Sequence, residues 1–67
     1  MQGNKIAGLR RKVEVGQRDL ANKLGIAPQR LSDIERGYLP VPEGMERSVR
    51  SALRGILQER LAKVGRR

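Results

Sequence analysis

Apolar residues recur at helical spacing early in the chain, and the first such run predicts a helix from about Lys5 to Val13. Four positions of this run fall on one helical face: Ile6, Leu9, Arg10 and Val13. Asn4 stands just before the run, where a helix N-cap is expected. An unpaired charge on a buried face is costly, so we expect the arginine to have an acidic partner.

The pattern breaks at Val15-Gly16 and resumes as a second predicted helix over about residues 17–24. Gly16 is an acceptable N-cap for this helix. Its inward positions are Leu20, Ala21 and Leu24. Gly25 follows at the position where a helix end favours a left-handed residue, which glycine adopts without a steric penalty.

A third helix is predicted to begin at Pro28, whose missing N–H would be unpaired at a first helical position, and to end at Gly37. Leu31 and Ile34 face inward. Glu35 follows Leu31 by four residues and shares its face, so it is the expected partner of the arginine in the first helix. The solvent side of this helix is expected to carry five polar residues: Gln29, Arg30, Ser32, Asp33 and Arg36.

The C-terminal part carries one long apolar stripe at helical spacing. An extended linker precedes it, because Leu39 and Val41 each stand before a proline and are disfavoured in the helical region. From Glu43 onward the stripe comprises Met45, Val49, Ala52, Leu53, Ile56, Leu57, Leu61 and Val64. Gly55 lies within the stripe and favours its division into two helices, with one continuous helix as the alternative.

The chain is expected to form a single domain, residues 1–67, with a C-terminal helical segment over residues 43–64. Alternation of polar and apolar residues never lasts long enough for a strand, so the predicted fold is all-α with four to five helices. A chain of this size buries only about 60% of the surface that it exposes when unfolded. A stabilising partner subunit is plausible on that ground alone.

The net charge of +8 is large for 67 residues. Residues 1–38 carry eight Lys/Arg against four Asp/Glu, and residues 39–67 carry seven against three, so each part is net +4. Such an excess points to a polyanionic partner, with nucleic acid ahead of a membrane surface. Tyr38 is the one aromatic residue, which argues against proteins that stack single-stranded bases on aromatic side chains.

Several functional classes lack the residues that they need. The sequence has no cysteine and no histidine, and it has no paired carboxylates or phosphate-cradling glycine loop, so we expect neither an enzyme nor a metal or other cofactor. No apolar run approaches the roughly 18 residues of a membrane span, and the N-terminus lacks a signal-peptide core. The expected location is therefore the cytoplasm, at the nucleoid.

The stretch from Gln17 to Gly37, QRDLANKLGIAPQRLSDIERG, resembles the helix-turn-helix of the phage lambda repressor and Cro family. The resemblance runs from Ile6 to Leu53. The matching features are the helix-opening glutamine, the Leu-Ala pair, the turn glycine and the closing Glu-x-Gly: Gln17, Leu20-Ala21, Gly25 and Glu35-Arg36-Gly37. Members of the family often link an arginine of the first helix to the glutamate that ends the third. Two positions depart from the family: Glu14 replaces a common glycine and Ala27 replaces a preferred Ser or Thr cap.

The resemblance implies that the third helix reads base edges in the major groove of double-stranded DNA. Gln29 would bind adenine, Arg30 or Arg36 would reach guanine or phosphate, and Asp33 would accept a hydrogen bond from a cytosine amino group. Ser32 would contact a base or a phosphate. In the absence of the family pattern, these side chains would be read as an ordinary solvated face.

Phosphate contacts are implied for a second group of residues: Gln17, Arg18, Asn22, Lys23 and Tyr38. Gln17 is the strongest of these, because it opens the second helix. Arg18 and Lys23 fit a solvated surface as well, and Tyr38 has a small core cap as its alternative.

The end of the C-terminal stripe extends past what so small a core can use. Met45, Val49 and Leu53 are expected to pack on the first three helices. The later apolar positions are expected to form a two-fold dimer surface: Ile56, Leu57, Leu61 and Val64. A dimer would set two recognition helices about 34 Å apart, which suits a palindrome. The alternative is that this segment only completes a monomer.

Together these features predict a sequence-specific transcriptional regulator, in its simplest form a phage- or plasmid-style repressor that binds a palindromic operator as a homodimer. Two other classes remain as alternatives. One is a protein-interaction module such as an antitoxin or adaptor, and the other is an architectural or recombination accessory protein that binds DNA through its backbone.

Overall fold

Four α-helices and their connections make up the computed structural model, which describes residues 2–65. The helices are α1 (Gly3–Lys12), α2 (Gln17–Leu24), α3 (Pro28–Glu35) and α4 (Met45–Gly65). Over these residues the chain contains no β-strand, so the predicted all-α class is confirmed. None of the helices over residues 2–65 combines the length and the apolar character needed to cross a bilayer.

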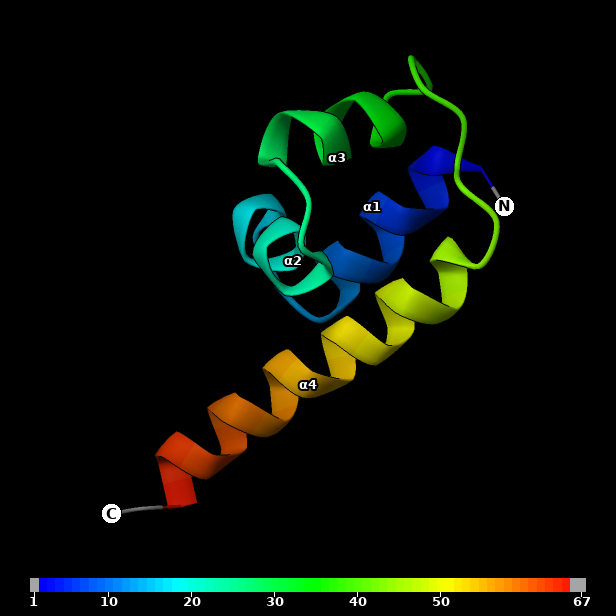
Figure 1. Ribbon diagram of the computed structural model, residues 1–67. Coiled ribbons are helices and arrows are strands. Elements are labelled where there is room, and N and C mark those ends of the chain that lie inside the picture. The colour runs from blue at the N-terminus through cyan, green and yellow to red at the C-terminus, as the bar shows by residue number, and fades with distance from the viewer. Residues whose placement is uncertain (1, 66–67) are drawn as a thin grey trace.

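The helices are arranged so that α3 and α4 lie on opposite sides of the molecule, with α1 and α2 between them (Figure 1). Helix α4 packs along α1 and α2. Its last turns continue past the other helices toward the C-terminus (Figure 1). The Cα atoms accordingly span 43 × 19 × 18 Å.

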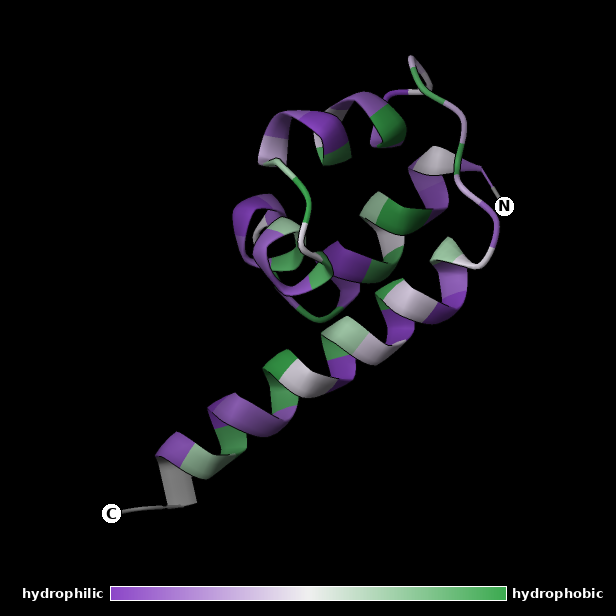
Figure 2. Ribbon diagram, viewed as in Figure 1, coloured by the Kyte–Doolittle hydropathy of each residue, from purple (hydrophilic) through white to green (hydrophobic). Residues whose placement is uncertain are grey.

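Apolar side chains from all four helices meet in one core. Hydrophobic positions recur along each of the four helices (Figure 2). Ile6, Leu20, Leu31 and Val49 have no exposed surface. The inward positions predicted for α2, α3 and the first half of α4 are thereby confirmed. Val15 was not predicted to be buried, yet it is only 2% exposed, because the turn after α1 carries it back into the core.

The first helix begins earlier than predicted. Gln2 is its N-cap and Asn4 lies within the first turn, so the prediction that Asn4 caps this helix is wrong. The first turn of α1 comes close to α3, because a Cβ on Gly3 would overlap the carbonyl oxygen of Ile34. Glycine at residue 3 permits this close approach.

The turn after α1 contains a strained residue. Glu14 has a φ of 57°, in the left-handed region that favours glycine, at the position where the lambda repressor family commonly has glycine. Arg60 of α4 donates hydrogen bonds to the carbonyl oxygens of Val13 and Glu14, at 3.2 and 3.0 Å. These bonds satisfy carbonyl groups at the end of α1 and tie the projecting part of α4 to the body of the protein.

The connection between α2 and α3 is a tight turn. Gly25 has a φ of 76°, and its N–H points to the carbonyl oxygens of Ala21 and Asn22, as predicted for a glycine that ends a helix. The N–H of Ile26 donates to the carbonyl oxygen of Ala21 at 3.0 Å. Ala27 then occupies the N-cap of α3 without a side-chain hydrogen bond, and Pro28 is the first helical residue.

The C-terminal stripe forms one helix, so the division into two helices at Gly55 is wrong. Gly55 instead leaves room for the Lys23 side chain of α2, because a Cβ there would lie 3.1 Å from Cε of Lys23. The Lys23 ammonium group crosses α4 at this point and forms an ion pair with Glu59. The helix begins at Met45 and not at Glu43, since Gly44 has a φ of 80°.

Candidate nucleic-acid interface

Helix α3 turns one face to the core and the opposite face to solvent, on the side of the molecule away from α4 (Figure 1). Leu31 and Ile34 anchor it, with 0% and 2% of their surface exposed. Four of the five predicted base-reading residues lie outside the core: Gln29, Arg30 and Arg36 are exposed and Asp33 is half-buried. The helix therefore presents a polar outer surface on an apolar support.

Gln29 and Asp33 bind each other across one helical turn. The Nε2 atom of Gln29 donates to Oδ1 of Asp33 at 3.1 Å. A glutamine amide has two N–H donors and one carbonyl acceptor, so one donor and the acceptor of Gln29 stay available. That pair is what bidentate recognition of adenine requires.

Ser32 differs from its prediction. It is only 8% exposed, so the placement of this residue on the solvent side of α3 is wrong. Residue 32 lies on the flank of the helix next to Glu35, and that flank is covered by α1 and the start of α2. Ser32 therefore lines the edge of a hollow between α1, α2 and α3 and does not belong to the outer face of α3.

The ion pair between Arg10 and Glu35 is present and buried. Arg10 donates from Nε to Oε2 of Glu35 at 3.0 Å and from Nη2 to Oε1 at 2.9 Å. Its third donor, Nη1, binds the carbonyl oxygen of Val15 at 3.1 Å. Over the described residues every buried side-chain nitrogen and oxygen has a hydrogen-bond partner. The pair thus joins α1 to α3 without leaving an uncompensated charge.

Gln17 belongs to the same network. Its Nε2 atom donates to Oε1 of Glu35 at 2.9 Å, and the side chain is half-buried. The sequence suggested a phosphate contact for this residue, and the structure adds an internal role: the start of α2 is bound to the end of α3. The second N–H of the amide remains as a donor whose direction the bond to Glu35 sets.

A shallow hollow at the junction of α1, α2 and α3 brings polar residues together beside α3. Its lining comprises Asn4, Ala7, Arg11, Gln17, Ser32, Glu35 and Arg36. Arg11 was not among the predicted site residues, although it is exposed and shares this hollow with Gln17 and Arg36. Its signal in the sequence is the basic run Arg10-Arg11-Lys12, in which only the first residue is buried.

The remaining predicted phosphate contacts divide into two groups. Arg18 is exposed at the start of α2, and Tyr38 is 72% exposed just after α3, so the core-cap alternative for the tyrosine is wrong. Asn22 and Lys23 instead line a hollow beside α4. Lys23 is engaged with Glu59, and its hydrogen bond lowers the pKa of that carboxyl group.

The predicted dimer surface is only partly free. Ile56 is 9% exposed and belongs to the core of its own chain, so its assignment to a dimer surface is wrong. Leu57 is half-buried, and Leu61 is 70% exposed. The side chain of Val64 lies outside the described residues.

Comparison of the chain with protein-family models, with curated proteins and with solved structures finds no match in any of the three.

Proposed function

We propose that this protein is a sequence-specific regulator that binds double-stranded DNA through a helix-turn-helix of the lambda repressor and Cro type. The observation that carries the proposal is the outer face of α3. It presents Gln29, Arg30, Asp33 and Arg36 on a helix whose inner face is anchored by buried leucine and isoleucine. A major groove admits such a helix, and these residue types bind base edges there.

The arrangement of α2 and α3 supports the helix-turn-helix reading. Ala21 has no exposed surface, as expected of a small residue where two helices cross closely. Gly25 makes the turn in a left-handed conformation and Pro28 begins the second helix of the pair. The free N–H of Gln17 and the guanidinium groups of Arg11 and Arg36 flank the outer face of α3, where DNA phosphates would lie.

A repressor that acts as a homodimer is the simplest form of this proposal. Leu61 is the large exposed apolar residue of the projecting part of α4, and half-buried Leu57 lies one turn before it. A second copy packed against these leucines would cover them and would pair two α3 helices on a palindrome. Occlusion of a promoter needs no further domain.

The proposal is tested by titrating isotopically labelled protein with a duplex while the backbone amide resonances are recorded. We expect the largest shifts at Gln29, Arg30, Asp33 and Arg36 and at the start of α2. A duplex that shifts none of these resonances overturns the proposal. Shifts confined to other helices would favour an architectural protein, and the absence of any shift would favour a protein-interaction module.

A further inference from the structure

The positive charge of this protein is concentrated outside the helix pair that we propose reads DNA. Residues 17–37 carry four Lys/Arg and three Asp/Glu, which leaves a net charge of only +1. The chain as a whole is +8, so the other residues contribute +7. Most of the capacity to neutralise phosphate charge therefore lies elsewhere.

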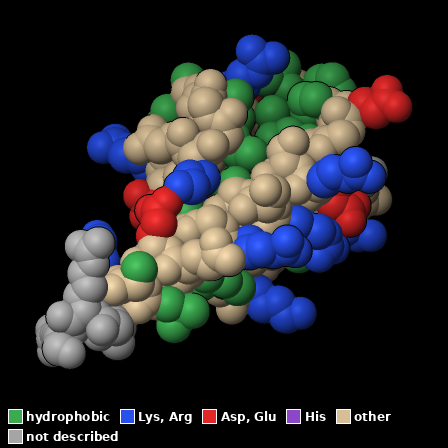
Figure 3. Space-filling view, turned by 60° about the horizontal axis from the view of Figure 1, so that its bottom comes forward, with side chains coloured by type: hydrophobic (Ala, Val, Ile, Leu, Met, Phe, Trp, Pro, Cys, Tyr) green, Lys and Arg blue, Asp and Glu red, His purple; other side chains and the backbone are tan. Residues whose placement is uncertain are grey.

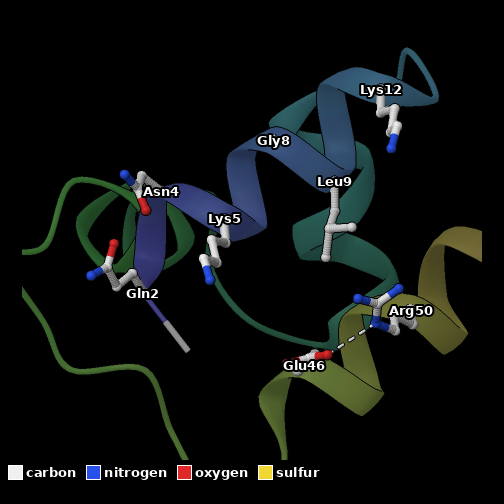
Figure 4. A pocket seen from close by; sticks show the side chains of 8 residues that line it. All are labelled: Gln2, Asn4, Lys5, Gly8, Leu9, Lys12, Glu46 and Arg50. Atoms are coloured by element: carbon white, nitrogen blue, oxygen red, sulfur yellow. Dashed lines mark hydrogen bonds and ion pairs between the residues drawn. The ribbon is translucent and has the colours of Figure 1, made fainter.

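Five of these basic residues form one surface across α1 and α4. A groove lies between α1 and α4. Lys5 and Lys12 line it from α1, and Arg50 lines it from α4 (Figure 4). Arg47 and Arg54 are exposed on the adjoining side of α4, where they line a second hollow. Lys and Arg side chains gather along this part of α4 in the space-filling view (Figure 3). We call these five residues the α1–α4 basic surface.

The chemistry of the α1–α4 basic surface suits a phosphate backbone. Of the ion pairs over residues 2–65, one lies on it, between Arg50 and Glu46 at 3.2 Å, so the five cations keep a net charge of +4. Its other lining residues are mostly small or hydrogen-bonding: Gln2, Asn4, Gly8, Leu9, Lys23, Leu24, Glu46, Ser48, Ser51, Ala52, Gly55 and Gln58. Arg and Lys with Ser, Asn and Gln are the side chains that contact DNA phosphates.

An acidic protein partner fits this surface less well than DNA. Binding of a protein normally centres on buried aromatic or aliphatic anchors. The hollows of this surface offer Leu9 and Leu24, and both are half-buried against the core of their own chain. What the surface offers a partner is therefore mainly charge and hydrogen-bonding groups.

The part of this surface on α4 lies away from α3. Helix α4 lies on the side of the molecule opposite α3, with α1 and α2 between them (Figure 1). Lys5 and Lys12 are seven residues apart, and so are Arg47 and Arg54, which is about 10 Å along each helix. The guanidinium groups of Arg47 and Arg54 are exposed on α4, so a second DNA segment can lie against them while α3 holds the first.

We propose that the α1–α4 basic surface binds the sugar-phosphate backbone of a second DNA segment without regard to sequence, so that one protein bridges two duplexes. Binding at this surface does not depend on α3, whereas bridging requires both surfaces. The variant that tests it is Arg47→Gln/Arg54→Gln, because both guanidinium groups are exposed. Its matched control is Arg47→Lys/Arg54→Lys, which changes the same two side chains and keeps both positive charges.

The experiment immobilises one duplex, saturates it with protein and measures capture of a second, labelled duplex. We expect capture by the wild type and the control, and at least a tenfold loss with Arg47→Gln/Arg54→Gln while the first duplex stays bound. The slope of log affinity against log salt for a duplex of arbitrary sequence should fall by about 0.9 for each phosphate contact removed. Equal capture by the wild type and this variant, or no capture by the wild type, overturns the proposal.

A third variant, Gln29→Ala/Arg30→Ala, separates this proposal from the function proposed for α3. If α3 does not bind DNA, this variant binds a duplex as the wild type does, and Arg47→Gln/Arg54→Gln still reduces that binding. If the α1–α4 basic surface binds an acidic protein instead, Arg47→Gln/Arg54→Gln weakens the binding of polyglutamate and leaves the binding of a duplex unchanged. That result also overturns the proposal.

Discussion

Arg10 and Glu35 form a buried two-point ion pair, with hydrogen bonds of 3.0 and 2.9 Å and side chains only 10% and 5% exposed. The pair connects α1 to the last residue of α3, and through Gln17 it also holds the first residue of α2. The outer face of α3 is therefore oriented by a polar network on its inner flank as well as by apolar packing.

Removing the acid from this pair should strongly destabilise the fold. Glu35→Ala strands the Arg10 guanidinium in the core, and we expect the free energy of unfolding to fall by about 3–5 kcal/mol. Urea denaturation measures the loss. Arg10→Met/Glu35→Leu removes both charges and should recover part of the stability. If the free energy of unfolding of Glu35→Ala is within about 1 kcal/mol of the wild-type value, the ion pair contributes little to stability.

The strained residue after α1 offers a stabilising change. Glu14→Gly should raise the free energy of unfolding by roughly 0.5–1 kcal/mol, because glycine adopts a φ of 57° without a Cβ penalty. Thermal unfolding measures the gain. Glu14→Ala is the control, since it removes the same charge but keeps the Cβ. Equal melting temperatures for the two variants would contradict the role of backbone strain.

The start of α3, which has no side-chain cap, offers a second stabilising substitution. Ala27→Ser should place a hydroxyl oxygen where it accepts a hydrogen bond from the first turn, which is worth about 1 kcal/mol. In a domain of this size that gain raises the melting temperature by about 4–8 °C. Ala27→Gly, which supplies no oxygen, should have a smaller effect. A Ser variant no more stable than the Gly variant would rule out side-chain capping at this position.

The dimer proposal depends on the projecting part of α4. Leu61→Glu should convert a dimer to a monomer in sedimentation equilibrium and should leave the melting temperature of the dilute protein unchanged, because Leu61 is 70% exposed. Ala62→Glu adds the same charge to the neighbouring exposed residue and is the control. A wild-type protein that stays monomeric at high concentration would contradict the proposed homodimer.

Helical periodicity predicted the buried faces of α2 and α3 because an alternation of apolar and polar residues reports directly on which side meets the core. It also predicted the partner of Arg10, since Glu35 shares the inward face of Leu31. Periodicity within one helix says less about its flanks. Ser32 is buried because α1 and the start of α2 cover that side of α3, a contact formed by residues distant in sequence.

The glycines also show that a sequence pattern within one helix does not reveal contacts between helices. Gly25 lies where the local pattern alone requires a helix to end, and its conformation agrees with the prediction. Gly3 and Gly55 serve contacts between helices, against the backbone of α3 and the side chain of Lys23. Propensity treats a glycine inside a helical pattern as a break, whereas close packing uses it as a point of approach. The second meaning becomes visible only in the assembled fold.

We propose above all that α3 reads a DNA sequence. The most direct test is selection from a randomised duplex library, carried out in parallel with the wild type and with Gln29→Ala. We predict that the wild type enriches a palindromic sequence with half-sites about one helical turn apart. Gln29→Ala should lose preference at one base pair of each half-site, typically worth about 1–3 kcal/mol, and keep the rest. Retention of DNA without any enriched sequence, or the same sequence enriched by both proteins, would contradict the claim.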